Sequence, residues 1–205
     1  MDAIEALDDG AYAHFSFVAN ESPQILDVMR PAYFISTYTG CMVLLLLIVM
    51  LFSIQRRFRS AWIAAACVAA AIALVESTHM FVPRPRPQDA VKWLGPLAQS
   101  GSYPSGNVLV FLLCLIFLGN ALWGFISGLW ARGLFVVTAA LLTVWVCLSQ
   151  FFLAIHYVTD VIGGIAGASL LGWIAIKFMA PATPPPVDVP ADAIQDLSGT
   201  TAIQR

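Results

Sequence analysis

The sequence predicts an all-α integral membrane protein, a helical bundle with about five transmembrane helices and an interfacial helix at its N-terminus. Two observations predict this class. Of the 205 residues, 60% are hydrophobic and only 11% are charged, whereas a soluble domain carries about 25% charged residues. The mean hydropathy is +0.82, and the apolar residues gather in runs near the length of about 20 residues that crosses a bilayer as a helix.

Five apolar runs are candidate spans, with boundaries good to about 2–4 residues. They are residues 38–55, 60–80, 105–125, 133–153 and 156–178. Each is expected to be helical, because backbone groups in lipid must find their hydrogen bonds within the segment. The four cysteines all lie inside these runs without the spacing of metal ligands. We interpret them as small buried hydrophobic residues and expect neither a metal nor a cofactor.

The chain outside the spans divides into two ends and one bundle. Residues 1–21 are mildly amphipathic and contain no basic region followed by an apolar core, so we expect an interfacial helix rather than a signal peptide. A partly ordered tail is the alternative. Residues 22–180 show no repeat and are expected to form one membrane domain. Residues 181–205 are rich in proline and small polar residues, which predicts a disordered tail.

Basic residues predict how the bundle sits in the membrane. Arg56, Arg57 and Arg59 fill the short loop after the first span, and positive charge in short loops favours the cytoplasmic side. The N-terminus and the 81–104 loop are then outside, provided that Arg84 and Arg86 serve a site there. We therefore expect an integral membrane protein, in the cytoplasmic membrane if bacterial.

Three polar segments would meet at the outer ends of the spans. The first is Arg84-Pro85-Arg86-Pro87, where prolines end a helix and two guanidinium groups could bind phosphate bidentately. Contact of these arginines with lipid headgroups is the alternative. The second is Pro104-Ser105-Gly106-Asn107, which precedes an apolar run and predicts a helix start with Ser105 as the N-cap. A helix start attracts anions, although it can equally be an ordinary cap.

The third segment contains His156 and Asp160, which would share one face if both lie on a helix. A carboxylate that accepts from one imidazole nitrogen leaves the other nitrogen free to act as a nucleophile or base. A structural histidine–aspartate contact at the membrane interface is the alternative. Gly163, Gly164 and Gly167 follow, and we interpret them as residues that allow close helix packing.

Together the three segments resemble the type 2 phosphatidic acid phosphatase family, which includes lipid phosphate phosphatases, undecaprenyl pyrophosphate phosphatases and vanadium haloperoxidases. The family pattern is Lys, six residues and Arg-Pro; then Pro-Ser-Gly-His; then Ser-Arg, five residues, His, three residues and Asp. The resemblance covers roughly residues 22–180. The matching residues are Arg86-Pro87, Pro104-Ser105-Gly106, Ser149, His156 and Asp160.

The resemblance implies a role for each matching residue. His156 would attack phosphorus and form a phosphohistidine, and Asp160 would orient it. Arg86, Ser105 and Gly106 would hold the phosphoryl oxygens. Arg84 could assist them, although the family pattern assigns it no role.

Three family positions are substituted, with His79 at the Lys, Asn107 at the His and Gln150 at the Arg. The family His protonates the leaving oxygen, which Asn107 cannot do, and the loss of a general acid costs about 10²–10⁴-fold in rate. Gln150 lacks the guanidinium charge that stabilises a transferring phosphoryl group. His79 is a cation only when protonated, although a nearby phosphate would favour that form and keep it as a phosphate ligand.

Three functions are compatible with these residues. The first is a phosphatase or phosphotransferase that acts through a phosphohistidine on a lipid phosphate or polyprenyl pyrophosphate. The second is a catalytically inactive relative that binds lipid phosphates or regulates a membrane partner. The third, a channel or transporter component, has only Glu76 as a polar candidate within a span and is the least favoured. The expected partners are membrane lipids and no nucleic acid.

Overall fold

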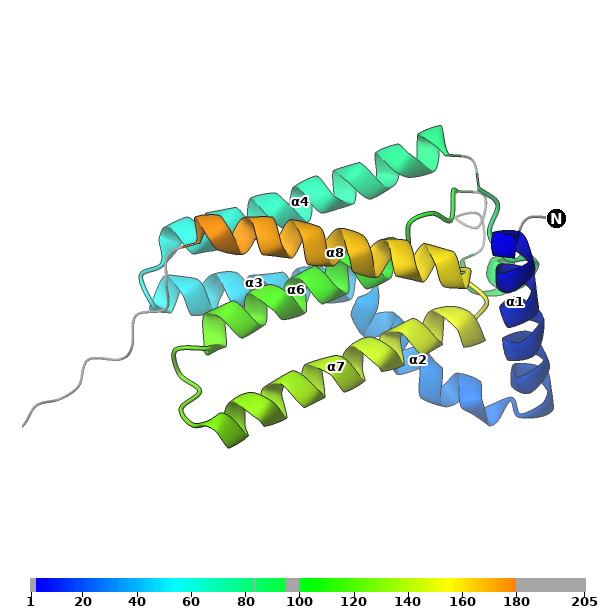
Figure 1. Cartoon of the computed structure of the whole chain (residues 1–205), viewed down its shortest axis with the longest axis horizontal. Coiled ribbons are helices and arrows are strands. Elements are labelled where there is room, and N and C mark those ends of the chain that lie inside the picture. Colours follow the sequence, from blue (N-terminus) through cyan, green and yellow to red (C-terminus); the bar gives the residue numbers. More distant parts are fainter. Residues whose placement is uncertain (1–2, 83, 95–99, 180–205) are drawn as a thin grey trace, which may run out of the picture.

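The computed structural model describes residues 3–82, 84–94 and 100–179, and all regular structure in these ranges is helical. The long helices α3, α4, α6, α7 and α8 run alongside one another, and α1 lies across one end of them (Figure 1). The C-terminal tail predicted for residues 181–205 lies outside the described residues. The helices are α1 (Ala3–Glu21), α2 (Gln24–Ser36), α3 (Tyr38–Ile54), α4 (Phe58–Phe81), the 3₁₀ turn η1 (Gln88–Ala90), α5 (Val91–Leu94), α6 (Gly106–Leu122), α7 (Leu129–Phe152) and α8 (Val158–Phe178).

The predicted integral membrane bundle is confirmed, with an approximate number of spans. By length and composition α4, α7 and α8 can each cross a membrane, and the bent pair of α2 and α3 adds a fourth span if the two helices are counted as one. The helix α6 has 17 residues and is shorter. It packs against α3, α4, α7 and α8, and ten of its residues are buried. A helix enclosed by protein can be short, because its ends need not meet lipid.

Close contact between α6 and α8 depends on small residues. A side chain at Gly164 would place its Cβ 2.8 Å from the backbone oxygen of Ser105. At Gly167 the Cβ would lie 2.9 Å from the side chain of Leu109. Helices approach this closely only where side chains are absent from the contact. The sequence interpretation of these glycines as packing residues therefore agrees with their surroundings.

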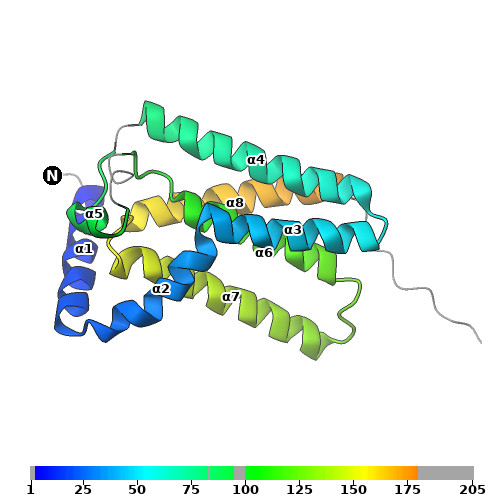
Figure 2. The same cartoon turned by 180° about the vertical axis from the view of Figure 1, so that it is seen from behind.

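The helix α2 was not predicted from the sequence. Asp27 and Arg30 form a salt bridge of 2.8 Å on its surface, and Pro31 lies inside it. These residues interrupt the apolar pattern by which spans are recognised. The axis turns by 54° between α2 and α3, at Thr37, whose side chain accepts a hydrogen bond from the backbone of Gly40 at 3.3 Å. Seen from behind, α2 crosses α7 and leads into α3 (Figure 2).

The two ends of the bundle differ in their polar contacts. We call the end that carries α1 and the turn between α7 and α8 the site end, and the end that carries the α3–α4 and α6–α7 connections the opposite end. At the opposite end Arg57 is buried and donates to the backbone carbonyl of Asn120 at 3.2 Å and to its side chain at 2.8 Å. Gln55 donates to the backbone of Ala121 at 3.0 Å. These bonds satisfy carbonyl groups at the C-terminal end of α6.

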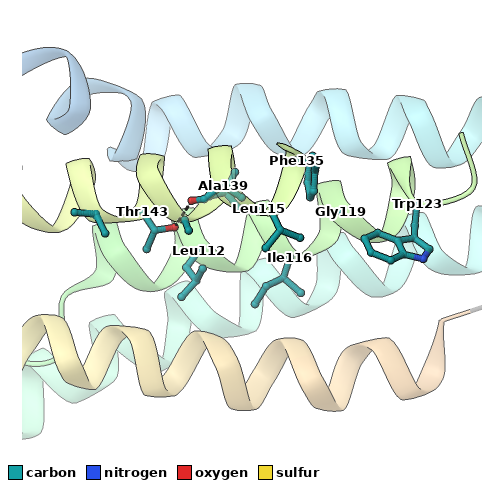
Figure 3. A pocket seen from close by; sticks show the side chains of 11 residues that line it. Leu112, Leu115, Ile116, Gly119, Trp123, Phe135, Ala139 and Thr143 are labelled. Atoms are coloured by element: carbon teal, nitrogen blue, oxygen red, sulfur yellow. Dashed lines mark hydrogen bonds between the residues drawn. The ribbon is translucent and has the colours of Figure 1, made fainter. Parts of the chain in front are cut away.

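A groove of about 550 Å³ lies between α6 and α7, well away from the site end. Figure 3 shows its apolar lining, which includes Leu112, Phe135 and Trp123. The hydroxyl of Thr143, a polar group in the lining, donates to the backbone of Ala139 at 2.8 Å. A groove with this lining suits hydrocarbon and has no charged group for a phosphate.

Candidate active site

The three polar segments predicted from the sequence meet at the site end. A cavity of about 440 Å³ opens there. It lies between α2, α3, α4, the start of α6 and the α7–α8 turn. Its lining includes five of the predicted site residues, namely His79, Arg86, Gly106, Asn107 and His156. Tyr33, Tyr38, Glu76 and Ser100 also line it.

The turn between α7 and α8 places His156 at this cavity. His156 lies in the turn itself, and α8 begins at Val158, so the condition that both His156 and Asp160 lie on a helix is not met. Ala154 has a φ of 52°, a left-handed conformation that reverses the chain after α7. The backbone of Tyr157 then donates to Oδ2 of Asp160 at 2.9 Å. This N-terminal cap starts α8 and brings the carboxylate back toward the imidazole.

Arg86 and Asp160 lie on opposite sides of the His156 ring. Nη1 of Arg86 lies 3.1 Å from Nε2 of His156. Because a guanidinium only donates, Nε2 accepts this bond and the ring proton is on Nδ1. Nδ1 lies 3.6 Å from Oδ2 of Asp160, a close polar contact that is longer than a hydrogen bond. The unprotonated nitrogen, which is the nucleophilic one, therefore faces Arg86 and the cavity.

His156 is neutral at ordinary pH. Burial lowers its pKa to about 4 from 6.5, the charge of Arg86 acts in the same direction, and Asp160 opposes both. The pKa of Arg86 is lowered from its ordinary value by burial, but a guanidinium starts so high that it stays charged. The site thus pairs a neutral imidazole with a fixed positive charge, an arrangement suited to attack on a phosphoryl group.

Arg86 is anchored by the residues around the nucleophile. Its Nη1 also donates to the carbonyl of Ile155 at 3.2 Å, and its Nη2 donates to the hydroxyl of Ser100 at 3.3 Å. Its buried Nε has no hydrogen-bond partner among the described residues. The hydroxyl oxygens of Ser102 and Ser105 are also buried and have no hydrogen-bond partner among the described residues. Buried donors without partners are uncommon, and phosphoryl oxygens are strong acceptors for such groups.

The start of α6 forms another wall of the cavity. Ser105 occupies the N-cap position as predicted, but its side chain makes no capping hydrogen bond. Its backbone instead donates to the carbonyl of Asp160 at 3.0 Å, which ties the start of α6 to the start of α8. Gly106 has no room for a side chain, because a Cβ there would collide with the hydroxyl of Tyr38. Gly106 and Tyr38 thus pack against each other at the wall of the cavity, which both residues line.

The three substituted positions bind each other or the backbone. The amide nitrogen of Asn107 donates to Oε1 of Gln150 at 3.4 Å. Gln150 is fully buried and also donates to the hydroxyl of Ser149 at 3.0 Å. His79 places Nε2 3.1 Å from the carbonyl of Pro104. Asn107 and Gln150 thus form a neutral pair at positions where the family pattern has a histidine and an arginine.

Arg84 makes contacts different from those of Arg86. It does not line the cavity. Nη1 donates to Oδ1 of Asp160 at 2.6 Å, and Nη2 forms a short salt bridge with Asp8 of α1. Its role as a phosphate ligand therefore stays a prediction without a contact to support it.

Sequence reasoning missed three residues at this site. Asp8, Thr159 and Tyr38 come from α1, α8 and α3. Asp8 is one of several acids near the N-terminus, and only its burial to 2% exposure distinguishes it from the others. No local pattern in the sequence could have identified it.

Comparisons with known proteins agree with this arrangement. A family model described as the PAP2 superfamily matches residues 60–184. The chain is similar in structure to a transmembrane PAP2-type phosphatidylglycerolphosphate phosphatase from Bacillus subtilis, with a TM-score of 0.71, 22% identity and 87% of each chain covered. It is also similar to LpxE from Aquifex aeolicus, with a TM-score of 0.58, 20% identity, and 81% of this chain and 94% of the other covered.

A search of curated proteins found no match. At these identities the solved structures support the fold, and the family model supports the membership. The family model covers more than half of the chain and includes all three polar segments. The chain therefore belongs to the PAP2 superfamily, as its three polar segments suggested.

Proposed function

We propose that this protein is a membrane lipid phosphatase or phosphotransferase that acts through a phosphohistidine on His156. The observation that carries the proposal is the neutral imidazole whose unprotonated Nε2 faces the cavity beside Arg86. Nε2 would attack phosphorus, and Arg86 would exchange its bond to the imidazole for bonds to phosphoryl oxygens. Asp160 would stabilise the proton on Nδ1 during the attack.

A lipid substrate is supported by a second cavity beside the first. This groove of about 740 Å³ lies along the bend between α2 and α3. It shares Tyr33, Thr37 and Thr39 with the polar cavity. Its other lining residues are Arg30, Phe34, Gly40 and Val43, so apolar side chains lie beside one charged group. A phosphate in the polar cavity could thus be attached to an apolar chain in the groove. We infer that the substrate is a lipid phosphate or polyprenyl pyrophosphate.

In this proposal a lipid pyrophosphate, which is a phosphoanhydride, is a better substrate than a lipid phosphate monoester. Asn107 cannot supply a proton to the leaving oxygen, and its partner Gln150 is equally neutral. The leaving group of a lipid pyrophosphate is a phosphate, whose second pKa is about 6, and it departs without a general acid. An alkoxide leaving from a monoester needs that acid. Purified protein assayed on both substrates should turn over the pyrophosphate faster, and faster turnover of the monoester would contradict this.

The second candidate function is phosphate binding without turnover. It is favoured by the pairing of Asn107 with Gln150, which leaves no acid at either position. Trapping with ³²P-labelled lipid phosphate or pyrophosphate separates the two functions, with His156→Ala as the matched control. Label on the native protein alone supports the phosphohistidine. Binding by both proteins without label on either supports the inactive relative.

We further propose that the site end faces the outside of the membrane. Arg56 and Arg57 lie at the opposite end, between α3 and α4, and Arg59 lies in the first turn of α4. Arg84 and Arg86, at the site end, are both bound within the protein. Arg57 is likewise bound within the protein, to Asn120. With these three arginines explained by internal contacts, the exposed Arg56 and Arg59 favour a cytoplasmic location for the opposite end.

A further inference from the structure

We propose that Asp8 of α1 and Arg84 are positioning residues for His156. Asp8 and Arg84 form a clamp, and Arg84 in turn holds Asp160 so that its second oxygen faces Nδ1 of the imidazole. The inference rests on the proposed role of His156 as the nucleophile. It assigns to the interfacial helix a part in the site that the three sequence segments do not contain.

The clamp begins with a buried acid. Asp8 is only 2% exposed, although it lies near the N-terminus on an otherwise largely exposed helix. Its Oδ1 accepts from the backbone of Thr159 at 3.0 Å, and its Oδ2 accepts from the hydroxyl of Thr159 at 2.5 Å. Oδ2 also forms the short salt bridge with Arg84. Thr159 lies in the first turn of α8, so these bonds fix α1 to the helix that carries Asp160.

Arg84 links Asp8 to Asp160, because its guanidinium binds both carboxylates. Nη1 donates to the hydroxyl of Thr159 and to Oδ1 of Asp160, both at 2.6 Å. The guanidinium carbon lies 4.8 Å above the ring of Tyr157. With Oδ1 held by Arg84 and Oδ2 by the backbone of Tyr157, the carboxylate has one orientation left. In that orientation Oδ2 lies 3.6 Å from Nδ1 of His156.

The charges of the clamp are balanced. Burial alone would lower the pKa of Arg84, but Asp8 and Asp160 reverse the effect, and the pKa is raised from its ordinary value. Removing either charge would therefore change the field at His156. Other titratable groups surround this position. They are Asp9 and Tyr12 on α1, Tyr33 on α2, Tyr38 on α3, Glu76 and His79 on α4, Arg86, Asp89 and Lys92 in the connection to α6, and Tyr157.

Docking of α1 does not depend on Asp8 alone. The ring of Phe15 stacks on Phe151 with centroids 5.2 Å apart and meets Phe152 edge-on at 5.0 Å. Tyr12 contacts the edge of Tyr157, with centroids 6.4 Å apart. These aromatic contacts remain when Asp8 is neutralised. A neutral variant at Asp8 therefore tests the charge rather than the presence of the helix.

The test is a ¹⁵N-histidine NMR titration of the full chain in detergent micelles, which reads the His156 pKa without any turnover. Arg84→Gln removes a cation and should raise that pKa by about 1 unit or more. Asp8→Asn combined with Arg84→Gln should return it toward the native value. Asp9→Asn combined with Arg84→Gln is the matched control, because Asp9 is exposed on the same helix, and it should leave the raised pKa unchanged.

Two results would overturn the proposal. One is an Arg84→Gln variant whose His156 pKa equals the native value. The other is a double variant at Asp8 and Arg84 that titrates like Arg84→Gln alone. If Arg84→Gln unfolds, the thermal midpoint decides, because the proposal requires the double variant at Asp8 and Arg84 to be more stable than the single one.

A second measurement separates positioning from phosphate binding. Arg84→Gln should leave the Kd for inorganic phosphate within about twofold of native, whereas Arg86→Gln should weaken it at least tenfold. Weakened binding in Arg84→Gln would make Arg84 a phosphate ligand and contradict the proposal. If the native protein binds no phosphate, the proposed function fails, while the NMR titration still tests the clamp.

Discussion

At the residue scale, the protonation state of His156 follows from its burial. His156 is 5% exposed, and the lowered pKa of about 4 means that its imidazole takes up no second proton in the folded protein at pH 5 to 7. An unfolded chain would bind one below about 6.5. The same burial that keeps the imidazole of the proposed nucleophile neutral therefore links the stability of the protein to pH.

The sign of this link can be predicted. Between pH 6.5 and 4 the unfolded state gains a proton that the folded state does not, so the free energy of unfolding falls as the pH falls, by about 3 kcal/mol across the window. Chemical denaturation in mixed micelles at pH 7, 5.5 and 4.5 would measure it. His156→Gln should lose this part of the pH dependence, and an unchanged slope in that variant would contradict the assignment.

The neutral pair of Asn107 and Gln150 carries a second prediction. Replacing both, as Asn107→His with Gln150→Arg, restores a proton donor for the leaving oxygen and a cation for the phosphoryl group. Turnover of a lipid phosphate monoester should rise by about 10²-fold or more. Turnover of a pyrophosphate should rise less, because its leaving group needs no acid. No gain in monoester turnover would mean that the backbone of the site has also diverged.

At the element scale, contact between α6 and α8 determines the shape of the site. The carbonyl of Asp160 accepts from the backbone of Ser105, and the carbonyl of Ser105 faces Gly164. The nucleophile segment and the start of α6 are thus joined through backbone atoms. Backbone atoms cannot move aside as a flexible side chain can, so this contact should tolerate no added volume.

Gly164→Ala should therefore destabilise the protein. Its Cβ would lie 2.8 Å from the carbonyl oxygen of Ser105, and forcing extra volume into a packed contact costs about 1–3 kcal/mol. Gly10→Ala is the matched control, because nothing lies within 4 Å of a Cβ at that position of α1. It should stabilise the protein by up to about 1 kcal/mol. Thermal unfolding in detergent measures both, and equal effects of the two variants would contradict the close contact.

At the scale of the whole molecule, the bundle has chemically distinct ends. The site end combines α1, the polar cavity and the arginines of the connection after α4. The opposite end has the α3–α4 arginines, of which Arg56 is exposed. By the positive-inside rule, the proposed lipid phosphatase site would face the outer leaflet.

Cysteine labelling tests this orientation. Lys92 lies at the site end, with its side chain 68% exposed, and Arg56 is exposed at the opposite end. In a variant without the four native cysteines, a membrane-impermeant maleimide should label Lys92→Cys in intact cells. Arg56→Cys should react only after the cells are permeabilised. The reverse pattern would place the site in the cytoplasm.

Much of the bundle was predictable because membrane helices depend on composition. The run at residues 60–80 became α4 and the run at 133–153 became α7, since about 20 apolar residues in lipid have few alternatives to a helix. The helix α2 escaped prediction because it carries Asp27, Arg30 and Pro31. Its helical state comes from packing against α7 and α3, which no local pattern records.

The sequence by itself determined the membrane class and the family, and it identified the motif residues that meet at the site. Spacing within a motif survives folding, so His156, Asp160, Arg86 and Ser105 could be named in advance. Only the tertiary structure decided which groups touch. It placed His156 in a turn rather than on a helix, paired Asn107 with Gln150, and brought Asp8 across about 150 residues of chain to Thr159. Contacts between distant segments depend on how whole helices pack, and packing is a property of the folded molecule.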